Sequence, residues 1–214
     1  MWHKVSPIAF RIPYIKTWKG SWFSDKKSYK DELSVDLKIR DILKKELNDI
    51  PVWDILISIE NDLVRVVVYT VKTALILGKS WENLERIQKL LSRKIWKKVI
   101  VDVKEIKKPD LNAKIVAFSI KNQIEKRMPY KRAIKQAISR SMEKWAKWIK
   151  IKIGWRLNWA EIARKETFKD GNIPTQTIRS DIDYSSMRAE TVYGTLGLKV
   201  WIYKGDIFKK KKSK

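Results

Sequence analysis

The chain of 214 residues contains no cysteine and a single histidine, His3. Without thiols it can form no disulfide framework, no thiolate metal site and no cysteine nucleophile. A Ser-His-Asp triad or a multi-histidine metal centre needs an ordered imidazole, whereas His3 lies at a chain end that we expect to fray. The sequence therefore excludes thiol, triad and multi-histidine metal chemistry.

Long hydrophobic runs are also missing. The longest strongly apolar stretch, residues 66–77, is interrupted by Lys72 and is too short to cross a bilayer. The N-terminal residues show no apolar run followed by a small-residue cleavage site, so no signal peptide is visible. We expect a soluble, cytoplasmic protein.

Negative charge is scarce relative to positive charge. Lys and Arg number 48 against 24 Asp and Glu, which gives a formal net charge of +24, while 44% of the residues are hydrophobic. That apolar share is typical of a folded protein and excludes a disordered basic tail. A field of this strength favours a polyanionic partner, and the length allows one large domain or two small ones.

Residues 1–106 predict an arm and a first domain. Scattered cations and aromatic residues over 1–23, broken by two prolines, indicate an irregular arm. A helix is expected after Ser24, followed by a hairpin of strands at 52–59 and 63–70. An apolar turn at 73–77, a loop at Gly78, a helix and a strand at 98–104 complete a domain over 24–106.

The second half predicts another α+β domain, over residues 107–207. The break at 107–110 is the expected boundary, and two helices with apolar spacings of three and four follow, separated by Pro129. Residues 149–153 alternate Ile and Lys, as in a strand with one basic face. Further strands are expected at 177–184 and 191–203, and the basic tail, 208–214, is given no structure.

The loop at Gly78 allows two functional interpretations. Gly78, Lys79 and Ser80 resemble the end of a phosphate-binding P-loop, but that loop needs glycine where this chain has Thr73. The other interpretation is the Gly-x-x-Gly loop of a KH domain, which clamps a nucleic-acid backbone. The order of elements and Lys79 fit, whereas Trp81 stands where the second glycine would be. A plain turn between two helices is the alternative.

Three cations on the second long helix form the best candidate binding site. Lys131, Arg132 and Lys135 lie opposite the apolar stripe of that helix, and further cations continue the run. We predict that they bind phosphates, although a solvated helix face is the simpler alternative. Asp181 and Asp183 could hold Mg²⁺ or act as paired acids, but ion pairing with nearby arginines is the more economical explanation.

Seven stretches together resemble the bacterial proteins of the family of the third protein of the small ribosomal subunit. They follow the family's order and are residues 16–23, 65–79, 107–114, 130–135, 160–164, 177–184 and 193–205. The resemblance covers nearly the whole chain. It implies an N-terminal arm, a type II KH domain and a small C-terminal α+β domain.

The resemblance also implies a function without enzymatic turnover, cofactor or metal. Family members bind the small-subunit rRNA in the head and line the channel through which mRNA enters. Residues matching Lys131, Arg132 and Lys135 are associated there with unwinding of mRNA. Neighbours would be small-subunit proteins ten, fourteen and two. Further rRNA contacts are expected at Lys4, Arg11, Arg156, Arg164 and Arg179. A free KH-type RNA-binding or assembly factor is the alternative.

Glycine and tryptophan depart from the family in a systematic way. The chain has 7 Gly, about half the usual share, and 11 Trp. Seven tryptophans stand where the family carries glycine, at positions 2, 81, 96, 145, 148, 155 and 159. RNA-stacking platforms are one explanation, but the residues form no stripe on any one element. Our hypothesis is that the gene's UGA codons encode glycine and were translated as tryptophan.

Overall fold

The computed structural model describes residues 4–12, 14–48, 50–60, 63–78 and 81–208. The chain divides into two compact units, one formed by residues 18–107 and the other by residues 1–17 together with 108–214. The arm is thus shared between the two units. Within the described residues, no helix combines the length and the apolar character needed to cross a membrane.

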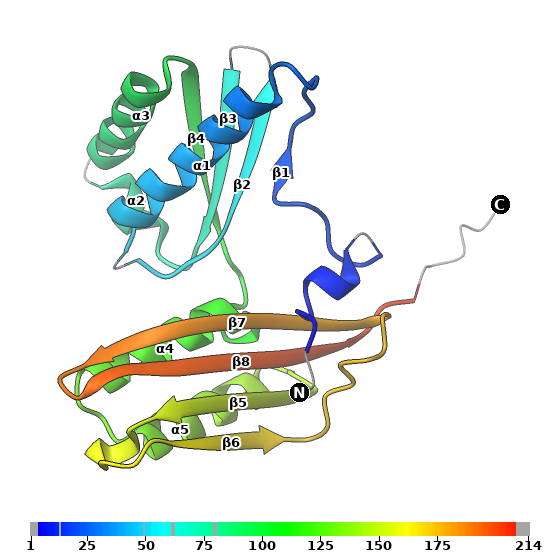
Figure 1. Cartoon of the computed structure of the whole chain (residues 1–214), viewed down its shortest axis with the longest axis vertical. Helices are drawn as coiled ribbons and strands as arrows, with labels where there is room; N and C mark the ends of the chain where they lie inside the picture. Colours follow the sequence, from blue (N-terminus) through cyan, green and yellow to red (C-terminus); the bar gives the residue numbers. More distant parts are fainter. Residues whose placement is uncertain (1–3, 13, 49, 61–62, 79–80, 209–214) are drawn as a thin grey trace. The chain divides into compact units, whose positions relative to one another are not determined.

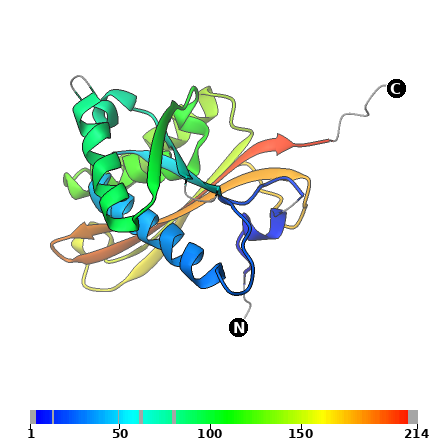
Figure 2. The ribbon, with the colours of Figure 1, turned by 90° about the horizontal axis from the view of Figure 1, so that it is seen from above.

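The first unit is a four-stranded sheet with three helices. The sheet order is β1 (Gly20–Ser21), β2 (Val52–Glu60), β3 (Leu63–Thr70) and β4 (Lys98–Glu105). The β2–β3 hairpin is antiparallel, and β1–β2 and β3–β4 are parallel. Helices α1 (Tyr29–Glu46) and α3 (Glu82–Ile95) lie side by side, and the short α2 (Thr73–Leu77) links β3 to α3 (Figures 1 and 2).

Strand alternation builds the core of this unit. In β3 the buried residues are Val64, Val66 and Val68, each fully inaccessible, as expected for every second residue of a strand with one covered face. Helix α1 contributes Ile39 and Leu43 to the same apolar cluster. Because these side chains recur every three or four residues along the helix, its other face carries the charges.

The second unit packs two helices on one face of an antiparallel sheet. Helices α4 (Ala113–Glu125) and α5 (Tyr130–Glu143) lie behind the sheet in Figure 1. The strands follow the order β6 (Arg164–Asp170), β5 (Trp148–Trp155), β8 (Gly194–Asp206) and β7 (Ser180–Thr191). Buried isoleucines of β5, at 149, 151 and 153, meet Ile120 and Ile134 of the helices in one core.

The α+β class and the order of most elements agree with the sequence prediction, and three details differ. The last two strands begin three residues later than expected, at Ser180 and Gly194. Strand β6 was missed because its residues are mostly exposed and Phe168 supplies its packing against the core. The arm is less irregular than predicted, since Gly20–Ser21 pairs with β2.

Candidate nucleic-acid interface

The loop after α2 requires glycine at position 78. Gly78 has φ of +73°, and a Cβ placed there would come within 2.7 Å of the Asn83 side chain at the start of α3. A side chain at this position would therefore meet both backbone strain and a close contact. Lys79 and Ser80, which were predicted to complete the loop, lie outside the described residues.

The segment before the loop does not have the shape of a P-loop. Thr73 is the first residue of α2, so residues 73–77 form helix where the first part of a phosphate-binding loop would have to be. Trp81, which follows the loop, has φ of +68° and is 61% exposed. The backbone at this point takes the left-handed conformation that favours glycine.

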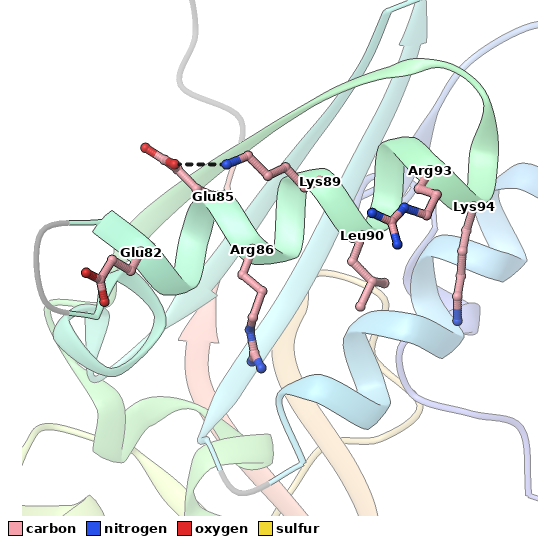
Figure 3. A pocket seen from close by; sticks show the side chains of 7 residues that line it. All are labelled: Glu82, Glu85, Arg86, Lys89, Leu90, Arg93 and Lys94. Atoms are coloured by element: carbon pink, nitrogen blue, oxygen red, sulfur yellow. Dashed lines mark hydrogen bonds and ion pairs between the residues drawn. The ribbon is translucent and has the colours of Figure 1, made fainter.

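A hollow on the surface of α3 carries both signs of charge (Figure 3). Lys89 forms an ion pair with Glu85 at 3.4 Å, and Arg86 forms one with Glu46 of α1 at 3.1 Å. Figure 3 shows Arg86, Leu90 and Lys94 pointing to the same side of the helix. Because internal carboxylates neutralise part of its positive charge, this face is a weaker candidate for binding a polyanion.

The α5 face differs from the α3 face because its cations have no acidic partner among the residues that the structure describes. Lys131, Arg132 and Lys135 are all exposed, and none has an ion pair within the described part of the chain. Gln136 and Ser139 join them around a shallow hollow on the helix surface. The opposite side of the helix is anchored in the core, so three positive charges are held on a rigid support.

The two uncharged residues of this hollow were not predicted. Gln136 follows Arg132 by four positions, and Ser139 follows Lys135 by four positions, so each lies one helical turn beyond a predicted cation. Helical spacing was the signal that would have identified them. Both side chains can donate or accept hydrogen bonds, which suits contacts to sugar hydroxyls and phosphates.

The predicted RNA contact of Arg11 is wrong, because Arg11 is fully buried. Its guanidinium donates hydrogen bonds to the backbone carbonyls of Ser180 at 2.6 Å and Thr177 at 2.9 Å, and to three further carbonyls, at Pro7, Pro174 and Thr175. Burial lowers the pKa of Arg11, and Asp181 opposes that shift. This cation holds the arm to the second unit.

Two of the other predicted contacts are exposed and engaged within the protein. Arg164 forms an ion pair with Glu166 at 3.1 Å, and a hydrogen bond from Arg164 to the Tyr130 hydroxyl raises the Arg164 pKa. Arg179 pairs with Asp206 at 3.3 Å.

The remaining two predicted rRNA contacts are Arg156 and Lys4. The Arg156 guanidinium donates to the Ala160 carbonyl at 3.1 Å, and Lys4 is exposed and close enough to Lys150 to affect its titration. Their roles in RNA binding stay predictions.

Both aspartates form ion pairs, as predicted, but their partners are lysines and not the nearby arginines. Asp181 pairs with Lys16 at 2.7 Å. Asp183 pairs with Lys204 at 3.8 Å and accepts a hydrogen bond from the first backbone N–H of α4, that of Ala113, at 3.0 Å. The register of β7 against β8 shifts between Asp181 and Ile182. No cluster able to hold a metal ion occurs within the described ranges.

Two protein-family models match this chain, each largely within one of its two units. The model of the family described as "KH domain" matches residues 38–111, and that described as "Ribosomal protein S3, C-terminal domain" matches residues 120–202.

Curated relatives match nearly the whole chain. The "Small ribosomal subunit protein uS3" of Persephonella marina is 44% identical over 96% of this chain and 91% of its own length. The protein of the same name from Hydrogenovibrio crunogenus is 41% identical over 98% of this chain and 92% of its own length. The one from Psychrobacter sp. is 39% identical over 97% of this chain and 84% of its own length. The chain therefore belongs to the uS3 family of small ribosomal subunit proteins.

Proposed function

We propose that this chain binds small-subunit rRNA in the head of the subunit and lines the channel through which mRNA enters. As a uS3 family member it is a structural ribosomal protein and not an enzyme. Its partners are rRNA, mRNA and the neighbouring small-subunit proteins ten, fourteen and two, in the cytoplasm. The α5 cations grip the phosphates of separated mRNA strands while translocation supplies the work.

The α5 face is the observation that carries this proposal. Lys131, Arg132 and Lys135 point to solvent and have no acidic partner in the described part of the chain, whereas Ala133 and Ile134 on the other side are fully buried. A phosphate that binds these cations therefore displaces only water and counterions. A helix fixed by its core side also holds its charges in place as a strand moves past.

A translation assay on reconstituted ribosomes tests the proposal. A variant with Lys131→Ala, Arg132→Ala and Lys135→Ala should enter small subunits normally and slow translation through stable mRNA hairpins, while leaving unstructured messages unaffected. The matched control is Lys26→Ala with Lys27→Ala and Lys30→Ala, which removes three exposed cations before and at the start of α1. Normal passage through hairpins by the first variant would contradict the unwinding role.

The same preparations separate this function from that of a free RNA-binding factor. A ribosomal protein should cosediment with small subunits in amounts near one copy per particle and survive a salt wash. Recovery only in the fraction that contains no ribosomes would favour the free KH-type factor.

A further inference from the structure

The outer face of the second sheet, opposite α4 and α5, gathers cations from all four strands. In β5 the isoleucines at 149, 151 and 153 face the core, so Lys150 and Lys152 face outward. Lys150 lies beside Lys169 of β6, and Lys152 lies beside Lys199 of β8. The cations of this outer sheet face are Lys150, Lys152, Lys165, Lys169, Arg188 and Lys199.

The structure shows no acidic side chain neutralising these six cations within the described ranges. None of them has an ion pair in the described part of the chain. Glu190 shares the face but lies toward the β7–β8 turn, opposite Thr195. Burial and repulsion from Lys4, Lys152 and Lys169 lower the pKa of Lys150. The cations are therefore close enough to repel one another, and an anion bound among them would relieve that repulsion.

Aromatic rings lie among the cations on the same face. The Lys150 ammonium lies 5.6 Å from the centre of the Trp201 ring, and Trp201 packs on Tyr184 with ring centres 5.1 Å apart. Trp201 and Tyr184 are partly exposed. Rings interleaved with cations are typical of surfaces that bind single-stranded nucleic acids, since cations meet phosphates and rings stack on bases.

We propose that this outer sheet face is a second RNA-binding surface, which holds a single-stranded segment of RNA. It is distinct from the α5 face because α5 lies on the other side of the same sheet (Figure 1). RNA is favoured over an acidic protein because the partly exposed rings of Tyr184 and Trp201 lie among the cations, where bases can stack on them. The proposal stands independently of the role of α5 in unwinding.

Binding of an oligouridylate of about 12 nucleotides to the full chain tests this surface. The variant Lys152→Gln, Lys169→Gln and Lys199→Gln should bind more weakly. The slope of log affinity against log salt should fall by about 2, since each single-strand phosphate contact contributes about 0.7. The matched control, Lys26→Gln with Lys27→Gln and Lys30→Gln, should keep the slope. Both glutamine variants are also made in the chain that carries Lys131→Ala, Arg132→Ala and Lys135→Ala. This background removes the contribution of the α5 face to RNA binding, so that the contribution of the outer sheet face is measured alone.

A second variant and a competitor make the test decisive. Trp201→Leu should weaken binding by about five-fold or more through loss of base stacking, with folding checked by circular dichroism. The glutamine variants keep the core side of each strand unchanged and report even if Trp201→Leu unfolds. An unchanged salt slope in the lysine triple variant would overturn the proposal. The competitor is polyglutamate, which stands in for an acidic protein. If the lysine triple variant lost only its binding to polyglutamate and kept its binding to RNA, the face would be assigned to an acidic protein.

A separate observation concerns the tryptophans. Six non-glycine residues in the described ranges have positive φ, and four of them are tryptophans: Trp81 at 68°, Trp96 at 61°, Trp145 at 72° and Trp155 at 130°. Bulky residues rarely take these angles, whereas glycine takes them freely. All four are at least 46% exposed, so packing of the indoles in the core does not account for the strain.

Two of these tryptophans end helices in the way that glycine does. After α5, the Trp145 N–H bonds to the Met142 carbonyl and the Ala146 N–H bonds to the Ser141 carbonyl. This is the Schellman pattern, whose left-handed residue is usually glycine. After α3, the Trp96 N–H bonds to the Ser92 carbonyl in the simpler left-handed ending.

We infer that the natural polypeptide carries glycine at positions 81, 96, 145 and 155. With glycine at position 81, residues 78–81 would have a glycine at each end, which is the Gly-x-x-Gly pattern of a KH loop. The backbone makes no such demand at Trp148, which lies within β5 and stacks on Tyr203. The inference therefore rests on the four strained positions and not on tryptophan content.

The gene and the cellular protein test this inference. UGA codons at the four positions, with an intact mass lower by one tryptophan-to-glycine difference for each, would support it. UGG codons there would overturn it. In recombinant protein, Trp96→Gly and Trp145→Gly should raise the melting temperature. The control Trp201→Gly should lower it, because Trp201 lies within a strand and packs against Tyr184.

Discussion

The site where the arm docks and the α5 face are both rich in cations, and they use them in opposite ways. At the docking site, Arg11 is surrounded by backbone carbonyls and Lys16 is paired with Asp181. On α5, Lys131, Arg132 and Lys135 have no acidic partner within the described ranges. A cation's partners inside the protein, and not its presence in the sequence, therefore decide whether it is free to bind RNA.

The largest effect is expected at the docking site. Arg11→Ala should lower the free energy of unfolding of the full chain by about 3 kcal/mol, because it leaves buried carbonyls without donors. Arg11→Lys should rescue little, since an ammonium has three donors in place of a planar fork. Denaturant titration measures both variants. A stability equal to that of the original chain would show that the carbonyl cage is not structural.

A single change on α5 should give the converse result. Lys135→Gln should leave the free energy of unfolding within about 0.5 kcal/mol of the original, because the side chain is exposed and has no ion pair with any described residue. The salt slope for single-stranded RNA should fall by about 0.7, as expected for one lost phosphate contact. Fluorescence anisotropy over a series of salt concentrations measures the slope. A destabilised protein with an unchanged slope would reverse the distinction between the two regions.

Acid should weaken the docking site and spare the α5 face. Ser180, whose carbonyl accepts a hydrogen bond from Arg11, donates its hydroxyl to Asp206. This hydrogen bond, and to a smaller extent one from Tyr203, holds the pKa of Asp206 below its ordinary value. A lowered pKa stabilises the fold above the unfolded-state pKa of about 3.9, and this stability is lost as the pH falls through the folded-state value. Asp206→Asn should therefore lower the melting temperature at pH 7, with a smaller difference in acid. A difference independent of pH would contradict this assignment.

Only a small coupling is expected from the Lys16–Asp181 ion pair. Both side chains are partly exposed, at 25% and 18%, and the N–O distance is 2.7 Å. A double-mutant cycle with Lys16→Ala and Asp181→Ala should give a coupling free energy of about 0.2–1 kcal/mol. A much larger coupling would mean that this pair, and not Arg11, is the principal anchor of the arm.

Periodicity predicted most of the fold because the core residues follow it closely. The Ile-Lys alternation at 149–153 became β5 with its isoleucines buried, and the apolar spacings of α4 and α5 put Ile120 and Ile134 in the core. Strand β6 could not be found in this way. Its exposed polar residues are held by pairing with β5, a long-range contact that leaves no local pattern.

The candidate site could be predicted only in part, for a related reason. The α5 cations were identified because helical spacing alone places them on one face. Arg11 was misassigned because its partners, such as Ser180 and Thr177, lie far away in the sequence. The outer sheet face was visible only as the basic side of one strand, since its other cations come from strands that pair with β5 and β8.

Crosslinking of mRNA to this protein in translating ribosomes tests the central claim most directly. With a photoreactive mRNA that carries a hairpin at the point where it enters the ribosome, mass spectrometry of crosslinked peptides should locate attachment on α5, within residues 131–139. The α5 triple variant should lose these crosslinks while the protein remains in the subunit. Crosslinks confined to other segments, with none on α5, would contradict the account.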